Sequence, residues 1–488
     1  MGNPSVLAPL LALGLGAFLV YLVGRIVSRR NETLAALTAA VYAVSLALAI
    51  QLGSEVTATR QPAWPVSAQA PVLRAEPGGM LVTFVGLGLG LLVALYSGRY
   101  LALDHRYEHY YPLLLLLSGG LTGMVMAVDL FTLYLFTVLT SAAAYVLVAF
   151  RRRTETAIEA GFKYAIMGAT AGILLLAGVG HYYRETGTLS LPLSGRGTAP
   201  WGALGMAFVL SGYAIKGALV PAHTWLPDAH GRAPSSISAM LSGIVIEVNL
   251  YVLVKAGLGM GWPARRLGWL LVGLSLANMT VGNALALMQV YGKRLLGYSS
   301  IAQVGYIMMA LGLGLAYNRP EAVSAGFFLL VAHAAMKGLA FLCKGICHFY
   351  CDATLIEELD GIVGRVPVTA ACFVVGLAGL AGVPLLAGFV GKWQLVVSAL
   401  DIAGPWVSLA IAVFVVNSLV SLGYYLPLVG RILKRPDNDG ERIRVSAWML
   451  VPTVVLALVV VGLGVFPQPV LALTREAARF LLTWGQQA

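Results

Sequence analysis

Charged side chains are scarce in this sequence of 488 residues: Asp, Glu, Lys and Arg together make up 11% of it. The apolar residue types make up 59%, and the mean hydropathy is +0.83. A water-soluble protein of this length would not carry such a composition, which excludes a soluble enzyme or binding domain. The composition indicates an integral membrane protein.

Motifs of cofactor and metal chemistry are also missing. The sequence has no glycine-rich phosphate loop after a strand, no nucleophile elbow and no haem motif, and its many glycines are interpreted as helix-packing positions. Cys343, Cys347 and Cys351 would share a helix face beside His348, but no matching second ligand pair exists, so packing is favoured over a metal site. We therefore expect no metal and no cofactor, and assign any redox chemistry to a partner.

Long apolar runs fill the sequence instead. About fourteen of them can span a hydrocarbon core of about 30 Å, and no large soluble domain fits between them. The first, residues 6–27, is too long for a signal-peptide core and lacks a small-residue cleavage site, so we expect it to be retained. The runs centre near Leu15, Ser45, Gly90, Gly119, Leu139, Ala171, Leu210, Val245, Gly273, Met308, Ala334, Gly379, Phe414 and Val459.

Basic residues gather in the loops after odd-numbered runs, with Arg265 and Arg266 as the main exception. By the positive-inside rule these loops face the cytoplasm, and both termini lie on the opposite side. The net charge of +11 is then a topology signal, and no nucleic-acid partner is expected. We expect a multi-pass protein of a prokaryotic inner membrane. The basic residues are Arg25, Arg29, Arg30, Arg99, Arg106, Arg151, Arg152, Arg153, Lys293, Arg294, Arg431, Lys434 and Arg435.

Two apolar runs are interrupted by a lysine and a proline. Lys216 precedes Pro221 in the first run, whereas Lys392 follows Pro384 in the second. A charge at bilayer depth costs roughly 2.5 to 3.5 kcal/mol on insertion scales, and a proline removes a helix hydrogen bond. Freed backbone groups are tolerated at that depth next to protein or a wet cavity, so paired broken helices indicate an ion path.

Three motifs resemble a known family. They are the run from His223 to His230 followed by Ala233-Pro234-Ser235, the run from Lys293 to Ser300, and the run from Gly388 to Lys392. These are similar to the antiporter-like proton-channel subunits shared by respiratory complex I, Mrp-type sodium/proton antiporters and energy-converting membrane hydrogenases. The match covers roughly residues 129–393 and is specific for the superfamily, but it does not choose among the three complexes.

The resemblance implies an all-α integral membrane fold of about fourteen transmembrane helices. It also implies two inverted five-helix repeats, each containing a broken helix, and a lateral chain of lysine, histidine and glutamate at mid-membrane depth. We expect residues 1–110 to form the first three helices, 111–262 the first repeat, 263–430 the second repeat and 431–488 the last helix.

The motifs assign roles to particular residues. Lys216 matches the lysine of the first broken helix, Lys392 the ionisable residue of the second, and His333 and Lys337 the family's histidine and lysine between them. A unit charge pair at about 4 Å is worth roughly 4 kcal/mol at an effective dielectric of about 20, so moving a partner charge can load or unload such a lysine. In the alternative interpretation, these lysines extend to the membrane interface and His333 is a hydrogen-bonded residue of the core.

Residues nearer the helix ends have two interpretations each. His223, Asp228 and His230 are candidates for proton access, with capping or loop fixing as the alternative. Asp129 is a candidate exit group or a helix cap. Lys255 and Lys344 are expected to extend to the interface.

The sequence also departs from the family. Val138 stands where the fifth helix normally carries a glutamate, the usual partner of the lysine matched by Lys216. Glu247 stands where the eighth helix commonly carries a lysine. It is the carboxylate placed deep within an apolar run, so we predict that it has become the charge partner of Lys216 or Lys337. Gln303 replaces a histidine and cannot carry a proton as a charged group.

Three functions follow. The first is a proton-translocating subunit of a redox-driven complex, without a redox centre of its own; the second is a subunit of an Mrp-type antiporter; the third is a structural spacer, suggested by Val138 and Gln303. The expected partners are other membrane subunits, the lipid bilayer and H⁺, with Na⁺ as the alternative ion.

Overall fold

The computed structural model describes residues 3–27, 30–56, 61–66, 71–102, 104, 106–151, 155–192, 200–402, 404–434 and 441–487. Four of the arginines used to predict topology, Arg29, Arg152, Arg153 and Arg435, lie outside these residues.

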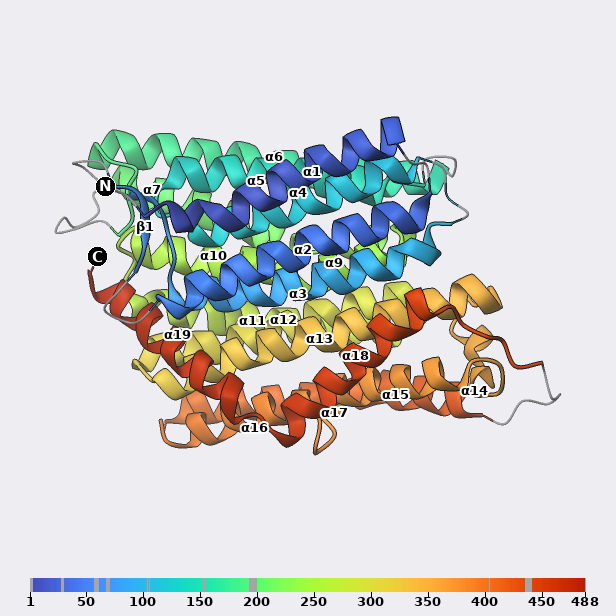
Figure 1. Ribbon diagram of the computed structural model, residues 1–488. Helices are drawn as coiled ribbons and strands as arrows, with labels where there is room; N and C mark the ends of the chain where they lie inside the picture. Colours follow the sequence, from blue (N-terminus) through green and yellow to red (C-terminus); the bar gives the residue numbers. More distant parts are fainter. Residues whose placement is uncertain are drawn as a thin grey trace.

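Long helices cross the molecule side by side, and both termini lie at the same end (Figure 1). Within the described part of the chain, eleven helices are long and apolar enough to cross a membrane. Together with α4 and two interrupted helices they make the fourteen segments that the sequence predicts. The first half contains α1 (Ala8–Leu22), α2 (Asn31–Ser54), α3 (Pro77–Tyr100), α4 (Tyr107–Met126), α5 (Leu130–Val148), α6 (Glu155–Thr186), α7 (Pro200–Lys216), α8 (Trp225–Arg232), α9 (Ser235–Met240) and α10 (Ile246–Gly259).

Short elements modify this pattern. A 3₁₀ turn η1 (Pro4–Leu7) precedes α1, a π-helical turn η2 (Val23–Val27) ends it, and a second π-helical turn η3 (Leu241–Val245) lies between α9 and α10. Strands β1 (Ala63–Val66) and β2 (Pro71–Arg74) pair antiparallel, with Ala63 opposite Arg74, at the end of the molecule that holds the termini.

The second half contains the other interrupted helix. Its elements are α11 (Ala264–Leu287), α12 (Gly292–Tyr317), α13 (Pro320–Cys351), η4 (Glu357–Leu359), α14 (Ile362–Arg365), α15 (Pro367–Ala381), α16 (Ala387–Leu400), α17 (Pro405–Leu433), α18 (Ala447–Val465) and α19 (Gln468–Gln487). The predicted last helix is thus built as two, because the chain bends at Phe466-Pro467, where proline cannot continue the helical hydrogen bonding. Figure 1 shows α18 and α19 crossing the bundle at an angle to each other.

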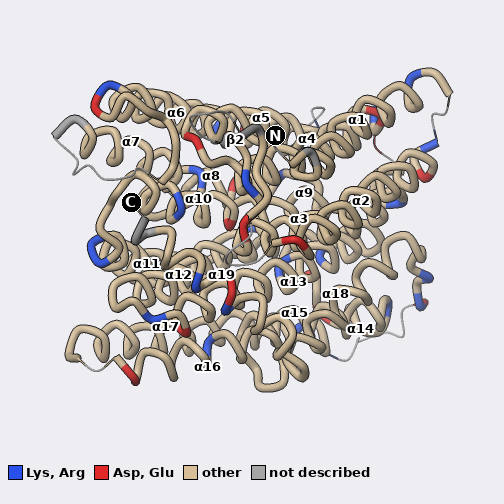
Figure 2. The backbone as a smooth tube through the Cα atoms, turned by 60° about the vertical axis from the view of Figure 1, so that its left-hand side comes forward, with Lys and Arg blue, Asp and Glu red and all other residues tan. Residues whose placement is uncertain are grey.

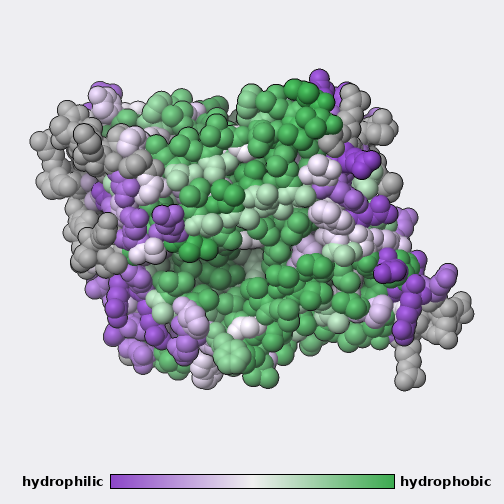
Figure 3. Space-filling model, in the orientation of Figure 1, coloured by the Kyte–Doolittle hydropathy of each residue, from purple (hydrophilic) through white to green (hydrophobic). Residues whose placement is uncertain are grey.

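The core is formed by three elements: the segment from α9 to α10, helix α12 and helix α13. The most apolar stretches of Ser235–Gly259 and α12 are 100% buried and that of α13 is 94% buried, compared with 33% for α6. The peripheral helices instead expose apolar side chains, and these cover the middle of the surface between two hydrophilic ends (Figure 3). This band is the surface expected of a protein that faces lipid.

Candidate functional site

The first broken helix consists of α7, a turn, and the short α8. The chain leaves the helix directly after Lys216, and Ala218 has a positive φ of 54°. Side chains satisfy backbone groups at the break: the Val220 N–H donates to the Asn278 amide oxygen at 2.8 Å, and the Trp225 indole donates to the Ile215 carbonyl at 2.9 Å. Non-helical backbone at membrane depth needs such partners.

Lys216 is buried, with 8% of its surface exposed. Its ammonium donates to the Ser141 hydroxyl of α5 at 2.6 Å, and no carboxylate among the described residues forms an ion pair with it. Val138, which stands one turn before Ser141, is 43% exposed. A neutral hydroxyl therefore occupies the place beside Lys216, and the apolar Val138 supplies no charge.

The second broken helix consists of α15 and α16. The interruption requires positive φ angles at Gly382 (90°) and Leu385 (70°). The Lys392 ammonium lies 3.2 Å from the carbonyl oxygens of both Leu380 and Ala381, at the C-terminal end of α15. It also donates to the Ser418 hydroxyl at 3.0 Å. The lysine thus satisfies carbonyls that the end of a helix leaves free.

Three ionisable side chains lie between the broken helices. The Glu247 carboxylate contacts the imidazole of His333, and Lys337, one turn further along α13, donates to the Leu296 carbonyl at 2.8 Å and to the Ser299 hydroxyl. Glu247 and Lys337 are 0% exposed and His333 is 1% exposed. Figure 2 shows that charged residues lie within the bundle as well as at its two ends.

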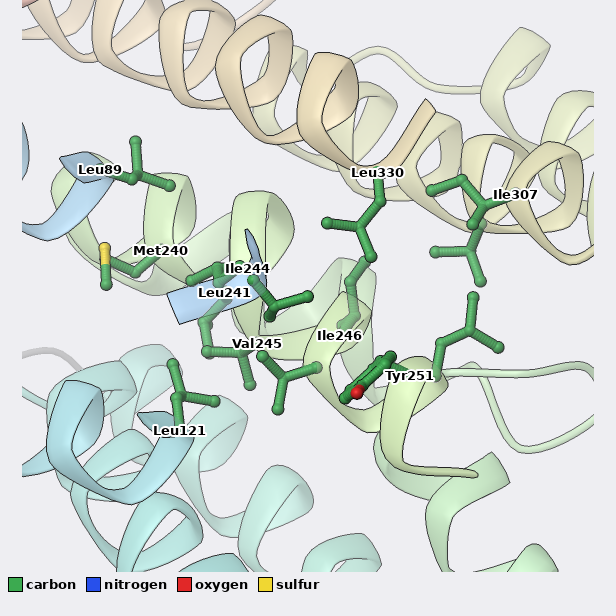
Figure 4. Packing of buried hydrophobic residues seen from close by; sticks show 14 of the residues in the cluster. Leu89, Leu121, Met240, Leu241, Ile244, Val245, Ile246, Tyr251, Ile307 and Leu330 are labelled. Carbon is green, nitrogen blue, oxygen red and sulfur yellow. The ribbon is translucent and has the colours of Figure 1, made fainter. Parts of the chain in front are cut away.

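The partner of Glu247 corrects the sequence-based prediction. We predicted Lys216 or Lys337, whereas the structure pairs Glu247 with His333. The reason is the close packing of the segment before Glu247 against α13: a Cβ added at Gly243 of η3 would lie 3.2 Å from the Ala334 carbonyl. Figure 4 shows Leu241, Ile244 and Val245 of η3 among Leu89, Leu121 and Leu330 of α3, α4 and α13. Single π-helical turns of this kind occur frequently at functional sites.

A polar stripe on α12 connects Lys337 with the second broken helix. The Gln303 side-chain amide donates to the Leu380 carbonyl at 3.0 Å, which is the oxygen that also accepts from Lys392. Ser299 stands one turn before Gln303 and accepts from Lys337. Gln303 therefore has a defined place in the hydrogen-bond network, although its amide carries no charge.

Two of the predicted access residues, Asp228 and Asp129, lie at opposite ends of the molecule. Asp228 lies 3.4 Å from Lys163 and 3.4 Å from Arg294, and these three line a cavity of about 200 Å³ together with Lys293 and Lys344.

The two predicted access histidines differ in their surroundings. His230 is fully buried and stacks on Phe341 at 4.7 Å between ring centroids, and neither ring nitrogen has a hydrogen-bond partner within the described residues. The ring nitrogen Nδ1 of His223 lies 3.2 Å from the Pro221 carbonyl. His223 is therefore held by the loop, whereas His230 has unused hydrogen-bonding capacity.

Asp129 lies at the other end and caps α5. Its carboxylate accepts from the backbone N–H groups of Phe131 (3.0 Å) and Thr132 (2.8 Å). This geometry favours the helix-cap interpretation of Asp129 over an exit role.

The structure also buries two lysines that were expected to extend to the interface. Lys255 (3% exposed) and Lys344 (1% exposed) are both buried. Lys344 donates to the Ala353 carbonyl, and Lys255 pairs with Glu76 at 2.8 Å. Burial replaces the predicted extension to water, because neighbouring carbonyls and a carboxylate accept from these ammonium groups. The sequence analysis did not identify Glu76. Its position could have indicated it, because it is an acidic residue directly before the Pro77-Gly78 start of an apolar run.

The three cysteines of α13 differ in burial. Cys343 and Cys347 are buried and Cys351 is partly buried, and all three are free thiols. Over the ranges that the structure describes, no group of three or more His, Cys, Asp or Glu side chains is placed to hold a metal ion.

Two interrupted membrane helices, each with a buried lysine, and a row of buried ionisable side chains between them define a class of membrane protein: the antiporter-like ion-translocating subunits. Comparison with known proteins agrees. The family described as NADH:quinone oxidoreductase/Mrp antiporter, TM, matches residues 127–421. The chain belongs to this family.

Its relatives resemble it over most of their length. NADH-quinone oxidoreductase subunit N of Desulforudis audaxviator is 33% identical over 454 residues, which are 87% of this chain and 86% of the relative. The F(420)H(2) dehydrogenase subunit N of Methanosarcina mazei is 30% identical, covering 82% of this chain and 83% of that protein. A chain of the membrane-bound sulfane sulfur reductase, an archaeal respiratory membrane complex, is 28% identical with a TM-score of 0.86, and 99% of each chain is covered. The predicted superfamily and fold class are confirmed.

Proposed function

We propose that this chain is the proton-translocating, antiporter-like subunit of a redox-driven membrane complex. The observation that carries the proposal is the buried row of Lys216, Glu247 with His333, Lys337 and Lys392 within the family fold. The N subunits it resembles belong, by name, to an NADH-quinone oxidoreductase and an F(420)H(2) dehydrogenase. Electron transfer is assigned to partner subunits, and this chain contributes the ion path.

Protons reach the row from the cavity beside Asp228. Its lining combines the carboxylate of Asp228 with the ammonium groups of Lys293 and Lys344. His230 is buried, and its ring nitrogens have no partner within the described part of the chain; it is the group that receives a proton between this cavity and Lys337. His333 and Lys337 stand one turn apart on α13, so a charge on one repels a charge on the other, and a proton arriving at Lys337 drives the proton at His333 onward.

The side chains of the row favour H⁺ over Na⁺. Lysine ammonium groups are donors only, and they cannot coordinate a cation. Hard cations bind instead to clusters of oxygen ligands. The row carries one carboxylate, Glu247, and that carboxylate faces His333.

The two lysines of the row provide the test. In vesicles containing the complex that purifies with this chain, Lys216→Met and Lys337→Met should each stop proton pumping while electron transfer and assembly persist. Neutralising a buried charge removes an insertion cost, so the helix should still form. Lys434→Met, at an exposed ion pair with Asp360, is the matched control and should pump normally. Normal pumping in either row variant would contradict the proposal and would favour the structural spacer; Na⁺-dependent pumping would identify the other ion.

We also propose that the end with the cavity faces the cytoplasm, because the basic loops lie at that end. A tag at the C-terminal Gln486-Gln487-Ala488 should then react with an impermeant reagent applied to intact cells. Of these three residues, Ala488 lies outside the described residues. Labelling that requires opened membranes would reverse the orientation.

A further inference from the structure

The end of the molecule that holds the termini contains a buried ion pair that the row does not use. Lys255 Nζ lies 2.8 Å from Glu76 Oε2, and the two side chains are 4% and 0% exposed. Lys255 also donates to the carbonyls of Val125 (2.9 Å) and Ala127 (3.1 Å) at the end of α4. Glu76 Oε1 has no hydrogen-bond partner among the described residues. Burying both charges carries a large desolvation cost, so the pair calls for a function or a strong structural reason.

Helix α10 leads from this pair to the centre of the row. Glu247, Tyr251 and Lys255 are spaced four residues apart, so their side chains lie on one face of the helix. Eight residues of helix rise about 12 Å, close to half of a hydrocarbon core of about 30 Å. One face of α10 therefore joins the Glu247–His333 contact at mid-membrane depth with the Glu76–Lys255 pair near the surface.

Tyr251 packs against the first turn of α3, which Glu76 precedes. A Cβ added at Gly78 would lie 3.0 Å from the Tyr251 hydroxyl, so a larger residue there would require the two side chains to move slightly apart. A cavity of about 10 Å³, lined by Thr83, Thr122 and Val248 among others, lies between α3, α4 and α10. That volume is close to the smallest that holds one water molecule. This cavity lies beside Ile244 and Val248, next to Glu247 in the chain, and Glu247, Tyr251 and Lys255 do not line it.

The C-terminal helix covers the ion pair. Trp484 of α19 is 0% exposed, and its ring centroid lies 5.4 Å from Lys255 Nζ and 5.7 Å from the guanidinium carbon of Arg74. The Trp484 indole also donates to the Lys255 carbonyl at 3.2 Å. The tryptophan therefore separates the pair from solvent and ties α19 to the end of α10.

We propose that Tyr251, Lys255 and Glu76 form a proton exit branch from the Glu247–His333 contact to the surface that holds both termini, and that Trp484 closes this branch. The inference rests on the proposed function. A proton leaving Glu247 or His333 crosses bound water to the Tyr251 hydroxyl, which accepts it and passes its own proton on, so that the tyrosine stays neutral. Glu76 receives the proton and releases it to solvent when α19 moves, while Lys255 balances the carboxylate charge between turnovers.

The alternative is that the pair only fastens α3, α4 and α10 together. To separate the two, proton pumping and electron transfer are measured in the same vesicles with Glu76→Gln, Lys255→Met and Tyr251→Phe. We expect pumping to fall to the level of Lys337→Met with electron transfer retained, and Glu76→Gln with Lys255→Met to be no worse than either alone. The matched control is Asp104→Asn, which breaks the ion pair with Arg151 (2.9 Å) near the opposite end and should pump normally.

A second measurement tests whether Trp484 closes the branch. Trp484→Ala should raise proton permeability in vesicles without turnover, whereas Trp484→Phe should stay tight. Normal pumping in assembled Tyr251→Phe, which lacks a single oxygen atom, would overturn the branch even if Glu76→Gln failed to assemble. Normal pumping in Glu76→Gln together with loss in Lys337→Met would also overturn the branch and leave the proposed function intact. Normal pumping in Lys337→Met would instead overturn the proposed function.

Discussion

Lys216 and Lys392 each lie at the interruption of a broken helix, but their ammonium groups have different partners. Lys392 contacts two free carbonyls of α15 and the Ser418 hydroxyl. Lys216 contacts the Ser141 hydroxyl. An ammonium group has three donors, so the second site is complete within the chain, whereas the first leaves donors for water or a neighbouring group.

The surroundings of Lys216 and Lys392 differ as well. The face of α5 beside Lys216 is exposed and apolar at Phe131 (46%), Leu135 (50%) and Val138 (43%). Lys392 instead packs over the ring of the buried Tyr306 at 5.0 Å. The charge of Lys216 is therefore the one more sensitive to changes in its few contacts.

The largest expected effect comes from breaking the contact between Glu247 and His333. Glu247→Gln and His333→Gln should each lower proton pumping by about a hundredfold, the usual scale for loss of a proton-transfer group. The double variant should match the single ones, because Glu247 and His333 act as a unit. A double variant of Glu247→Gln and Lys216→Met shows whether Glu247 also serves Lys216, as we first predicted. Full pumping in Glu247→Gln would remove Glu247 from the path.

The two serines compare the broken helices directly. Ser141→Ala should lower pumping by about tenfold, because a hydrogen bond to a charged group contributes about 1.5 kcal/mol. Ser418→Ala should lower it by less than about threefold, since two carbonyls still accept from Lys392. Initial pumping rates in vesicles measure both. Equal losses would show that the two sites are equally dependent on their hydroxyl groups.

A carboxylate beside the first break would give Lys216 the charged partner that it lacks. Val138→Glu, with Glu247 and His333 unchanged, should raise pumping by several-fold. Val138→Gln is the matched control, because it has the same shape without the charge. A gain with glutamine would show that hydration rather than charge is limiting at Lys216.

The smallest effect is expected far from both breaks. The Asp360 carboxylate accepts from Lys434 at 3.1 Å and Arg431 at 2.9 Å, and the hydrogen bond from Lys434, assisted by Arg431, lowers its pKa. A lowered pKa contributes stability above the unfolded value of about 3.9, and that contribution disappears as the pH falls through the folded value. Asp360→Asn should cost under about 1 kcal/mol at pH 7, as is usual for an exposed pair, and nothing once the pH lies below the folded-state pKa of Asp360.

Thermal unfolding of detergent-solubilised protein at pH 7 and at low pH measures this difference. Pumping should not change in Asp360→Asn. A loss comparable to that of Ser141→Ala would show that the ion pairs of Asp360 influence the ion path.

Both breaks and the burial of Lys216, Lys337 and Lys392 could be predicted from the sequence, because a lysine in an apolar run is costly wherever the run packs. The partner of Glu247 could not, since it depends on how η3 approaches α13. The burial of Lys255 depends in the same way on Glu76, which lies far from it in the chain and next to it in space. Local patterns identify costly groups, and tertiary packing decides which group compensates each cost. The predicted boundaries of the two repeats stay predictions.

The π-helical turn η3 adds one residue to the path of the helix before α10. One residue corresponds to a rotation of about 100° for everything that follows. Glu247, Tyr251 and Lys255 share one helical phase, so a deletion of a single codon within Leu241–Val245 would turn all three side chains away from their present neighbours together. In this helix, the loss of one residue would displace three functional side chains at once, an effect that otherwise requires three substitutions.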